Sequence, residues 1–403
     1  MHAGKIRTQA RPHELSVAAK RIFDCGRWTA APAAASRRTN DGAGTSNRPE
    51  GGVFALLAWL PLLILSALQG VLFANVKIPF LYDPAVYSRF LLAVPLLILA
   101  ENLIGPRIAE ATSQFIFSGL IREEQYGDFD AAVEEGIRLR NSTLAEVLIL
   151  LLAYASAFES IRVFSTNSST WNSLMSESGH KLTYAGYWYL LVSIPVWQFL
   201  AYRWLWRAFV WYKFLHRMSK LELQLVPTHP DQAGGLGFLG EAHRLFGIFV
   251  FAFGAAGSGV FCREVLFEKT PIETYKIPIA AFIVVSLGLF LGPLFMFAPA
   301  LLQTRRKALH EYSTLGGQLG RLYHRKWVKG INPGGESMLS APDNTSLANY
   351  SHDYELVERM RAFPFEPRTA VVLAIAGLLP LVPLLATVMP MEEIFKLLLK
   401  VLG

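Results

Sequence analysis

Long, nearly uncharged apolar stretches recur along this 403-residue chain, and they restrict its fold more than any other feature. Inside a bilayer, each backbone N–H and C=O group must be bonded within its own segment, so such stretches cross as helices of about 20 residues. Only 17% of the residues are charged, against about 25% in soluble domains. The chain is therefore predicted to be all-α, a polytopic transmembrane helical bundle rather than a string of soluble domains.

Seven segments are predicted to span the membrane, and six spans are the alternative. They lie near residues 53–74, 90–104, 144–158, 184–200, 245–262, 277–302 and 370–390. Two are weaker, because the second ends in Glu101-Asn102 and the third carries Glu146. For those two, helices of a soluble core are the competing interpretation. Helical extensions of several spans are expected on the cytoplasmic side.

Basic residues are unevenly spread along the chain, which has 38 Lys and Arg against 31 Asp and Glu and a net charge of +7. Most of them fall in the N-terminal tail and in alternate connections, as in cytoplasmic loops of membrane proteins. This places the N-terminus on the cytoplasmic side. The positive charge then reflects topology, and nucleic-acid binding is not expected. Two cysteines are too few for a disulfide framework or a Cys-rich metal site.

Composition divides the chain into three parts. Residues 1–50 form a disordered basic tail, for which an organellar transit peptide is the alternative. Residues 51–390 form the membrane domain, including a cytoplasmic connection over 303–368. Residues 391–403 place Ile394, Leu397 and Leu398 on one helical face, which predicts a short interfacial helix.

The connection between the fourth and fifth segments carries the densest pattern of polar and glycine residues. His229 and Asp231 are followed by Gly234 and Gly235 and then by a helix. Backbone N–H groups exposed by glycines before a helix can hold an anion, so these four residues are candidate ligand-binding residues. The alternative is a structured elbow in which the polar side chains cap the backbone. Two metal-ligating side chains are too few for a metal site, so no metal or cofactor is predicted.

Charged residues near the ends of the apolar segments form a second candidate site. Arg203 and Arg207 are four residues apart and so share one helix face, and Glu101 and Glu146 lie at the same side of the membrane. A charge in the hydrocarbon costs roughly 2.5–3.5 kcal/mol, so each should find a partner or water. We expect a polar pocket in which Arg203, Arg207 and Glu146 meet His229 and Asp231. Interfacial ion pairs are the alternative.

Two further patterns suggest surfaces rather than pockets. Gly240, Gly247, Gly254 and Gly257 recur on nearly one helix face, which favours close packing against a neighbouring helix. The basic residues of the last large connection, Arg321, Arg325 and Lys326, predict contact with anionic lipid or with a protein partner.

Several short motifs of the chain resemble an uncharacterised group of bacterial multi-pass membrane proteins. The motifs are Arg203-Trp204-Leu205-Trp206-Arg207, Pro227-Thr228-His229-Pro230-Asp231 with Ala233-Gly234-Gly235-Leu236-Gly237-Phe238, and Leu139-Arg140-Asn141-Ser142. The chain departs from the expected spacing at Asn349-Tyr350. The resemblance implies a bacterial inner membrane location and carries no activity with it.

The residues favour a transporter or channel-like protein for a small, anionic solute that binds on the cytoplasmic side. The alternative is a non-catalytic membrane scaffold or sensor that binds anionic lipid or a protein partner. An enzyme is the third and least favoured interpretation, because no complete nucleophile, metal or acid/base set is visible. The lipid bilayer is the one partner the sequence requires, and the oligomeric state is left open.

Overall fold

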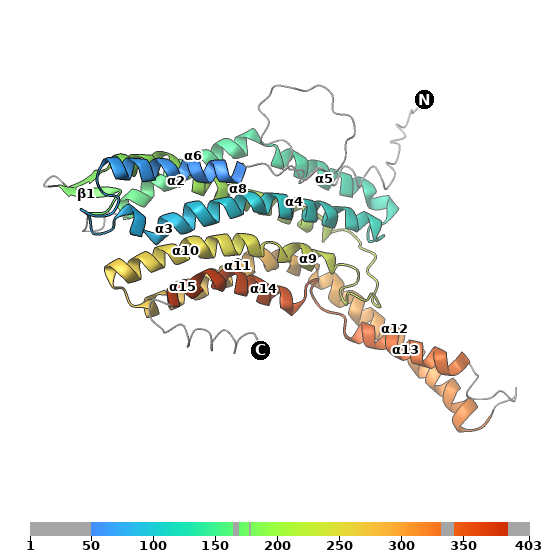
Figure 1. Ribbon diagram of the computed structural model, residues 1–403. Helices are drawn as coiled ribbons and strands as arrows, with labels where there is room; N and C mark the ends of the chain where they lie inside the picture. The colour runs from blue at the N-terminus through green and yellow to red at the C-terminus, as the bar shows by residue number, and fades with distance from the viewer. Residues whose placement is uncertain (1–49, 164–168, 177–178, 332–341, 386–403) are drawn as a thin grey trace, which may run out of the picture.

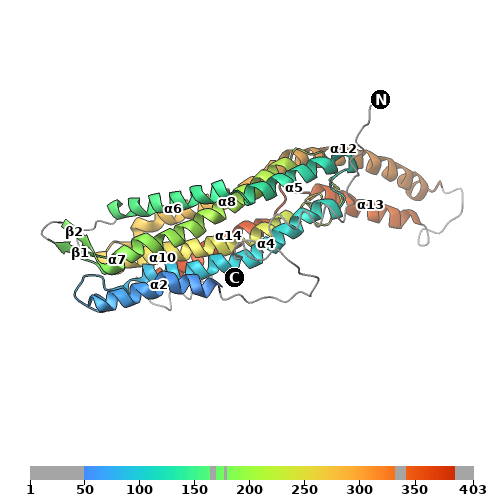
Figure 2. The ribbon, with the colours of Figure 1, turned by 90° about the horizontal axis from the view of Figure 1, so that it is seen from above.

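A computed structural model describes residues 50–163, 169–176, 179–331 and 342–385 of the chain (Figure 1). These residues form a long bundle of helices that run side by side, as two perpendicular views show (Figures 1 and 2). The predicted all-α bundle is confirmed, apart from one small β-hairpin. The predicted basic tail and the predicted interfacial helix at 391–403 lie outside the described residues.

The elements follow one another along the chain with few long connections. The α-helices are α2 (Glu50–Leu68), α3 (Pro84–Val86), α4 (Val94–Phe117), α5 (Tyr126–Arg140), α6 (Thr143–Val163), α7 (Tyr184–Trp188), α8 (Ile194–Met218), α9 (Phe238–Arg244), α10 (Gly247–Glu268), α11 (Lys276–Leu291), α12 (Ala298–Tyr323), α13 (Pro342–Glu358), α14 (Pro367–Leu378) and α15 (Val382–Leu385). Shorter π or 3-10 turns join or extend them, namely η2 (Phe80–Tyr82), η3 (Tyr87–Ala93), η4 (Glu123–Gln125), η5 (Tyr189–Ser193), η6 (Ile272–Tyr275), η7 (Gly292–Phe297), η8 (His324–Val328) and η9 (Leu379–Leu381). 

A two-stranded hairpin, absent from the sequence-based prediction, closes one end of the bundle. β1 (Ser173–Ser176) pairs antiparallel with β2 (Gly179–Leu182), with Ser173 opposite Leu182. Just before it, the Trp171 indole donates to the Asp83 carboxylate at 2.8 Å. Asp83 also caps α3 by accepting the Ala85 N–H. The Ser/Asn-rich connection has no alternating apolar pattern that would predict strands. It is held to the bundle by the buried Trp171 side chain rather than by a buried strand face.

The count of membrane spans differs from the prediction of seven. By length and composition, four helical stretches of the described chain can cross a membrane, or up to five if the bent pair α5–α6 is one span. The four are Pro84–Phe117, Phe238–Glu268, Ile272–Val328 and Pro367–Leu384. Of the predicted segments, 53–74 becomes a shorter apolar helix that ends at Leu68, and 184–200 continues into the arginine-bearing part of α8. The apolar helices indicate a membrane-embedded protein, but seven spans are not supported.

Glycines allow α9 and α10 to pack closely on their neighbours, as predicted. A Cβ on Gly254 would lie 2.7 Å from the Gly377 carbonyl oxygen of α14, and one on Gly240 would lie 2.8 Å from the Phe365 backbone. Gly247 likewise faces α14. Gly257 has open space around it, so its predicted packing role was wrong.

Helices α12 and α13 form an arm that projects past the end of the bundle opposite the β-hairpin (Figure 1). The two helices are antiparallel and pack on each other through the stacked rings of Tyr312 and Tyr350. Near the tip, the Lys326 ammonium pairs with the Asp343 carboxylate at 2.7 Å. We call this end of the molecule the arm end.

Candidate functional site

The predicted arginine pair is held inside the bundle by a carboxylate from another helix. Arg203 and Arg207 lie one turn apart on α8, and both guanidiniums bond to the same Oε1 atom of Glu101 on α4. The Arg203 Nη2 to Glu101 Oε1 distance is 2.7 Å. These three side chains are only 14–18% exposed. A buried group of this kind is stable only because the opposite charges and hydrogen bonds offset the cost of removing them from water.

Two small cavities flank this ion pair, and Arg140 and Arg207 line both of them. The first, of about 20 Å³, is also lined by Arg203 and by Glu146. The second, of about 10 Å³, is also lined by Trp204 and Phe246. Because a water molecule needs roughly 10–15 Å³ by the same measure, the first has room for one water or one small ion.

The charges of this group do not cancel. We call the group the arginine cluster, formed by Arg140, Arg203, Arg207, Glu101 and Glu146. Guanidiniums stay protonated at any physiological pH, so three positive charges face at most two negative ones. The Arg207 guanidinium also lies 5.5 Å from the centre of the Trp204 ring, a cation–π arrangement. Within the arginine cluster, guanidinium groups thus outnumber carboxylates by three to two.

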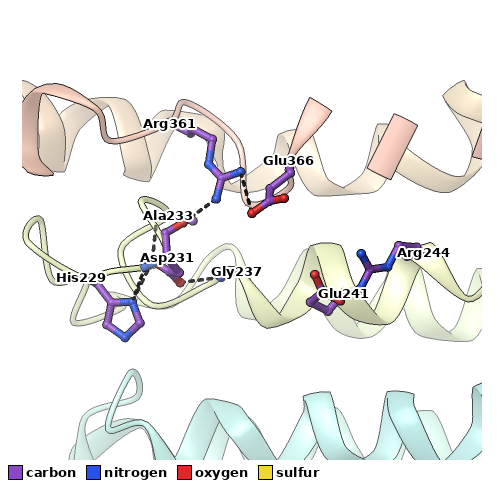
Figure 3. A network of polar contacts seen from close by, with 8 residues as sticks. All are labelled: His229, Asp231, Ala233, Gly237, Glu241, Arg244, Arg361 and Glu366. Carbon is purple, nitrogen blue, oxygen red and sulfur yellow. Dashed lines mark hydrogen bonds and ion pairs between the residues drawn. The ribbon is translucent and has the colours of Figure 1, made fainter. Parts of the chain in front are cut away.

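The glycine-rich loop between α8 and α9 has a different construction, centred on one carboxylate (Figure 3). Asp231 Oδ1 accepts the backbone N–H of Ala233 at 2.8 Å and that of Gly235 at 3.1 Å. Its Oδ2 accepts the N–H of Gly237 at 2.8 Å. His229 Nδ1 lies 2.8 Å from Oδ1. The loop's N–H groups are thus occupied by an anion of the chain itself, as the elbow interpretation predicts.

The loop conformation depends on its glycines. Gly234 and Gly235 have φ of +65° and +96°, values that side chains with a Cβ rarely adopt. A Cβ on Gly237 would lie 2.9 Å from the Asp231 side chain. The turn around Asp231 is therefore specified locally by glycine.

A residue far along the chain locks this loop in place. The Arg361 guanidinium donates to the Asp231 carbonyl at 2.5 Å, and the Arg361 backbone N–H donates to the Gln232 carbonyl at 2.7 Å. Figure 3 shows Arg361 reaching the loop from the segment that leads into α14, with Glu366 beside it. Arg361 follows α13 and is 130 positions away from Asp231, so nothing in the sequence pairs them.

Hydrogen bonds lower the pKa of the loop carboxyl. Burial alone would raise the pKa of Asp231, but the three backbone N–H groups and the His229 ring outweigh it and hold this pKa below its usual value. Asp231 is therefore ionised at neutral pH and acts as a structural acceptor.

The structure does not bring the loop and the arginine cluster into one pocket. The loop lies past the end of α4, where the Gln224 N–H bonds to the Leu120 carbonyl at 2.8 Å. Glu101 and Phe117 are both on α4, and 16 residues of helix span about 24 Å at 1.5 Å per residue. Of the five predicted pocket residues, Arg203, Arg207 and Glu146 line one cavity, whereas His229 and Asp231 lie elsewhere. The single shared pocket was wrong for this geometric reason.

Several site residues were missed by sequence reasoning. Arg140 joins the arginine cluster because α5 ends there and the chain bends by 44° into α6. Its only local signal is the Asn141-Ser142 helix break.

His243 is fully buried, with Nδ1 2.8 Å from the Leu239 carbonyl and Nε2 3.3 Å from the Trp211 indole nitrogen. Both ring nitrogens of His243 therefore have hydrogen-bond partners within the core.

The predicted basic surface lies on the arm. Arg321 and Arg325 are exposed near its tip, whereas Lys326 is held by Asp343. Their contact with lipid or a partner stays a prediction. Among the described residues, no group of three or more His, Cys, Asp or Glu side chains is placed to hold a metal ion.

No protein-family model, no curated protein and no solved structure matches this chain. The resemblance to bacterial inner-membrane proteins therefore stays a prediction that rests on the motifs alone.

Proposed function

We propose that this membrane protein binds a small anion at the arginine cluster and moves it across the bilayer, as a transporter or channel-like protein. The observation that supports this most directly is the excess of positive charge inside the bundle. The cavity that can take one small ion is lined by Arg140, Arg203 and Arg207 and by one carboxylate, that of Glu146. An ionisable group within a membrane bundle is expensive to bury and commonly marks a solute path.

The proposed topology follows from the same residues. In our proposal the arm end faces the cytoplasm of a bacterial inner membrane, because Arg140, Arg203, Arg207 and Arg305 to Lys307 all lie toward that end. The arginine cluster then sits where the apolar part of α8 ends, at the inner boundary of the hydrocarbon. The basic tail would also be cytoplasmic.

Movement of an anion requires a second conformation. The two cavities at the arginine cluster are small and share Arg140 and Arg207 in their linings. Since both contain Arg140, which sits at the bent α5–α6 junction, a change of that bend would join or separate them. This is the element that we expect to differ between the two states.

The experiment compares anion binding and flux for two matched arginine variants in the full-length protein. Arg140→Gln removes one cluster charge, whereas Arg138→Gln removes the same charge from an exposed position two residues earlier. With wild type and Arg138→Gln, we expect chloride, nitrate or phosphate to raise the melting temperature and to cross proteoliposome membranes. With Arg140→Gln, the apparent affinity for the anion in both measurements should fall about tenfold. This is the effect of losing one charged contact worth about 1.4 kcal/mol. Equal behaviour of the two variants would refute the proposal.

A scaffold or sensor is the second candidate function, and the projecting arm favours it. The ion pairs of the arginine cluster are also compatible with a purely structural role. In that case neither flux nor anion-dependent stabilisation should be seen with any variant, and partner or lipid contacts of the arm would carry the function.

A further inference from the structure

Two oppositely charged surfaces lie on different helices near the arm end of the molecule. The first is on α5 and η4 and is called the acidic face, formed by Glu123, Glu124, Asp128 and Glu134. All four side chains are exposed, and no ion pair joins any of them to Lys or Arg in the described part of the chain. The opposite side of α5, with Phe129, Ala132 and Val133, is buried against the bundle.

The second surface lies at the base of the arm and is hollowed. A depression of about 560 Å³ is lined by Pro299, Leu302, Gln303, Arg306 and Lys307 of α12, and we call it the basal hollow. These positions follow the i, i+3, i+4, i+7, i+8 spacing of one helix face. Leu301 and Ala308, on the packed side of α12, are buried. The basal hollow thus offers two cations above an apolar floor, and its lining contains no carboxylate.

The two surfaces lie at similar positions along the long axis of the bundle, as α5 and the base of α12 do in both views (Figures 1 and 2). Copies of one protein in one membrane share an orientation, so surfaces at the same height can meet when the copies diffuse together. Within one molecule, α5 lies at the top of the bundle and α12 lies at the bottom in the view of Figure 1. We propose that the basal hollow of one copy docks the acidic face of a second copy.

The charges make this pairing specific in direction. The charged side chains of both surfaces are exposed, so where they are in water their attraction acts over about 8–10 Å at physiological salt. The carboxylates of the acidic face meet Arg306 and Lys307 on the other surface, and although Lys307 also lies 3.9 Å from Glu311 on its own helix, both of these side chains are exposed. Opposite charges favour association of unlike surfaces and oppose association of like ones. The contact is heterologous, because each copy uses a different surface, and it can close into a ring or continue as a row.

Disulfide trapping in reconstituted vesicles tests the contact directly. Cysteines replace Gln303 in one tagged copy and Ala131, between Asp128 and Glu134, in a second copy with another tag. The native Cys25 and Cys262 are first changed to Ala. We expect a crosslinked species with both tags under mild oxidation. The matched pair Gln303→Cys with Ser351→Cys, which is an exposed position on α13, should not crosslink.

Charge exchange then separates a docking role from a folding role. Arg306→Glu with Lys307→Glu should reduce the crosslinked fraction about fivefold or more, and adding Asp128→Lys with Glu134→Lys in the second copy should restore it. Arg321→Glu with Arg325→Glu, at the arm tip, should change nothing. The proposal is overturned if the first variant crosslinks normally, if the exchange does not restore crosslinking, or if the tip variant is equally impaired. Anion flux is measured in the same vesicles, so failure here is distinct from failure of the proposed transport.

Discussion

The arginine cluster and the Asp231 loop both concentrate polar groups, but they satisfy them in opposite ways. In the loop, one carboxylate accepts three backbone N–H groups and faces a histidine, all within nine residues of chain. In the arginine cluster, one Oε1 atom of Glu101 is shared by two guanidiniums from another helix. The Asp231 carboxylate is therefore satisfied by its own loop, whereas the Glu101 carboxylate is satisfied by residues of a distant helix. Density of polar residues in a sequence marks structure as readily as it marks a site.

The largest expected effect comes from removing the shared acceptor of the arginine cluster. Glu101→Ala leaves two nearly buried guanidiniums without their carboxylate and should destabilise the protein by about 3–5 kcal/mol. Thermal or denaturant unfolding in detergent would measure this. Glu110→Ala is the control, since Glu110 pairs with Arg107 on the exposed surface of the same helix and should cost under about 1 kcal/mol. Similar losses for the two variants would show that the arginine cluster is not a buried unit.

The second effect concerns the ionised carboxylate of the loop. Asp231→Asn removes the charge that three N–H groups bond, so at neutral pH we expect a loss of about 2 kcal/mol. Because the pKa of Asp231 is lowered by folding, its contribution is complete above its usual value of 3.8 and is lost as the pH falls through the lowered value.

The free energy of unfolding of wild type and of Asp231→Asn should be measured from pH 7 to pH 3. We expect the difference between the two free energies to decrease only below about pH 4. A matched control is His229→Ala, whose side chain is 43% exposed and which should cost less. If Asp231→Asn instead leaves stability unchanged but abolishes anion binding, the loop is a binding site after all.

The smallest effect tests backbone geometry. Gly235→Ala forces a Cβ onto a residue with φ of +96° and should cost about 1–2 kcal/mol. Gly257→Ala, on a helix with nothing within 4 Å of the added Cβ, should be neutral or slightly stabilising. Faster hydrogen exchange at 233–237 in the first variant alone would confirm that the glycine specifies the loop. Equal exchange in both would contradict it.

Sequence periodicity was sufficient for features that depend on neighbours along one helix. The apolar runs predicted the helical membrane class, and the four-residue spacing placed Arg203 and Arg207 on one face. The seven-residue spacing placed three glycines on one packing face, and the structure then supplied their neighbours in α14 and the segment before it. Sequence periodicity overestimated the spans, because α2 is short and because α8 bears arginines within its length. It also missed the β-hairpin, whose residues carry no alternation.

The sequence by itself determined which residues repeat on a common face, since helix geometry fixes positions three and four apart. Only the tertiary structure decided their partners. Glu101 meets Arg203 across 102 positions, and Arg361 meets Asp231 across 130. Such pairs depend on how whole helices pack, and the attraction between two charges is settled by burial and distance after packing. For the same reason, the arginine pair and the loop lie at different positions along α4, although they are close in the chain. The part of α4 from Glu101 to Phe117 spans about 24 Å.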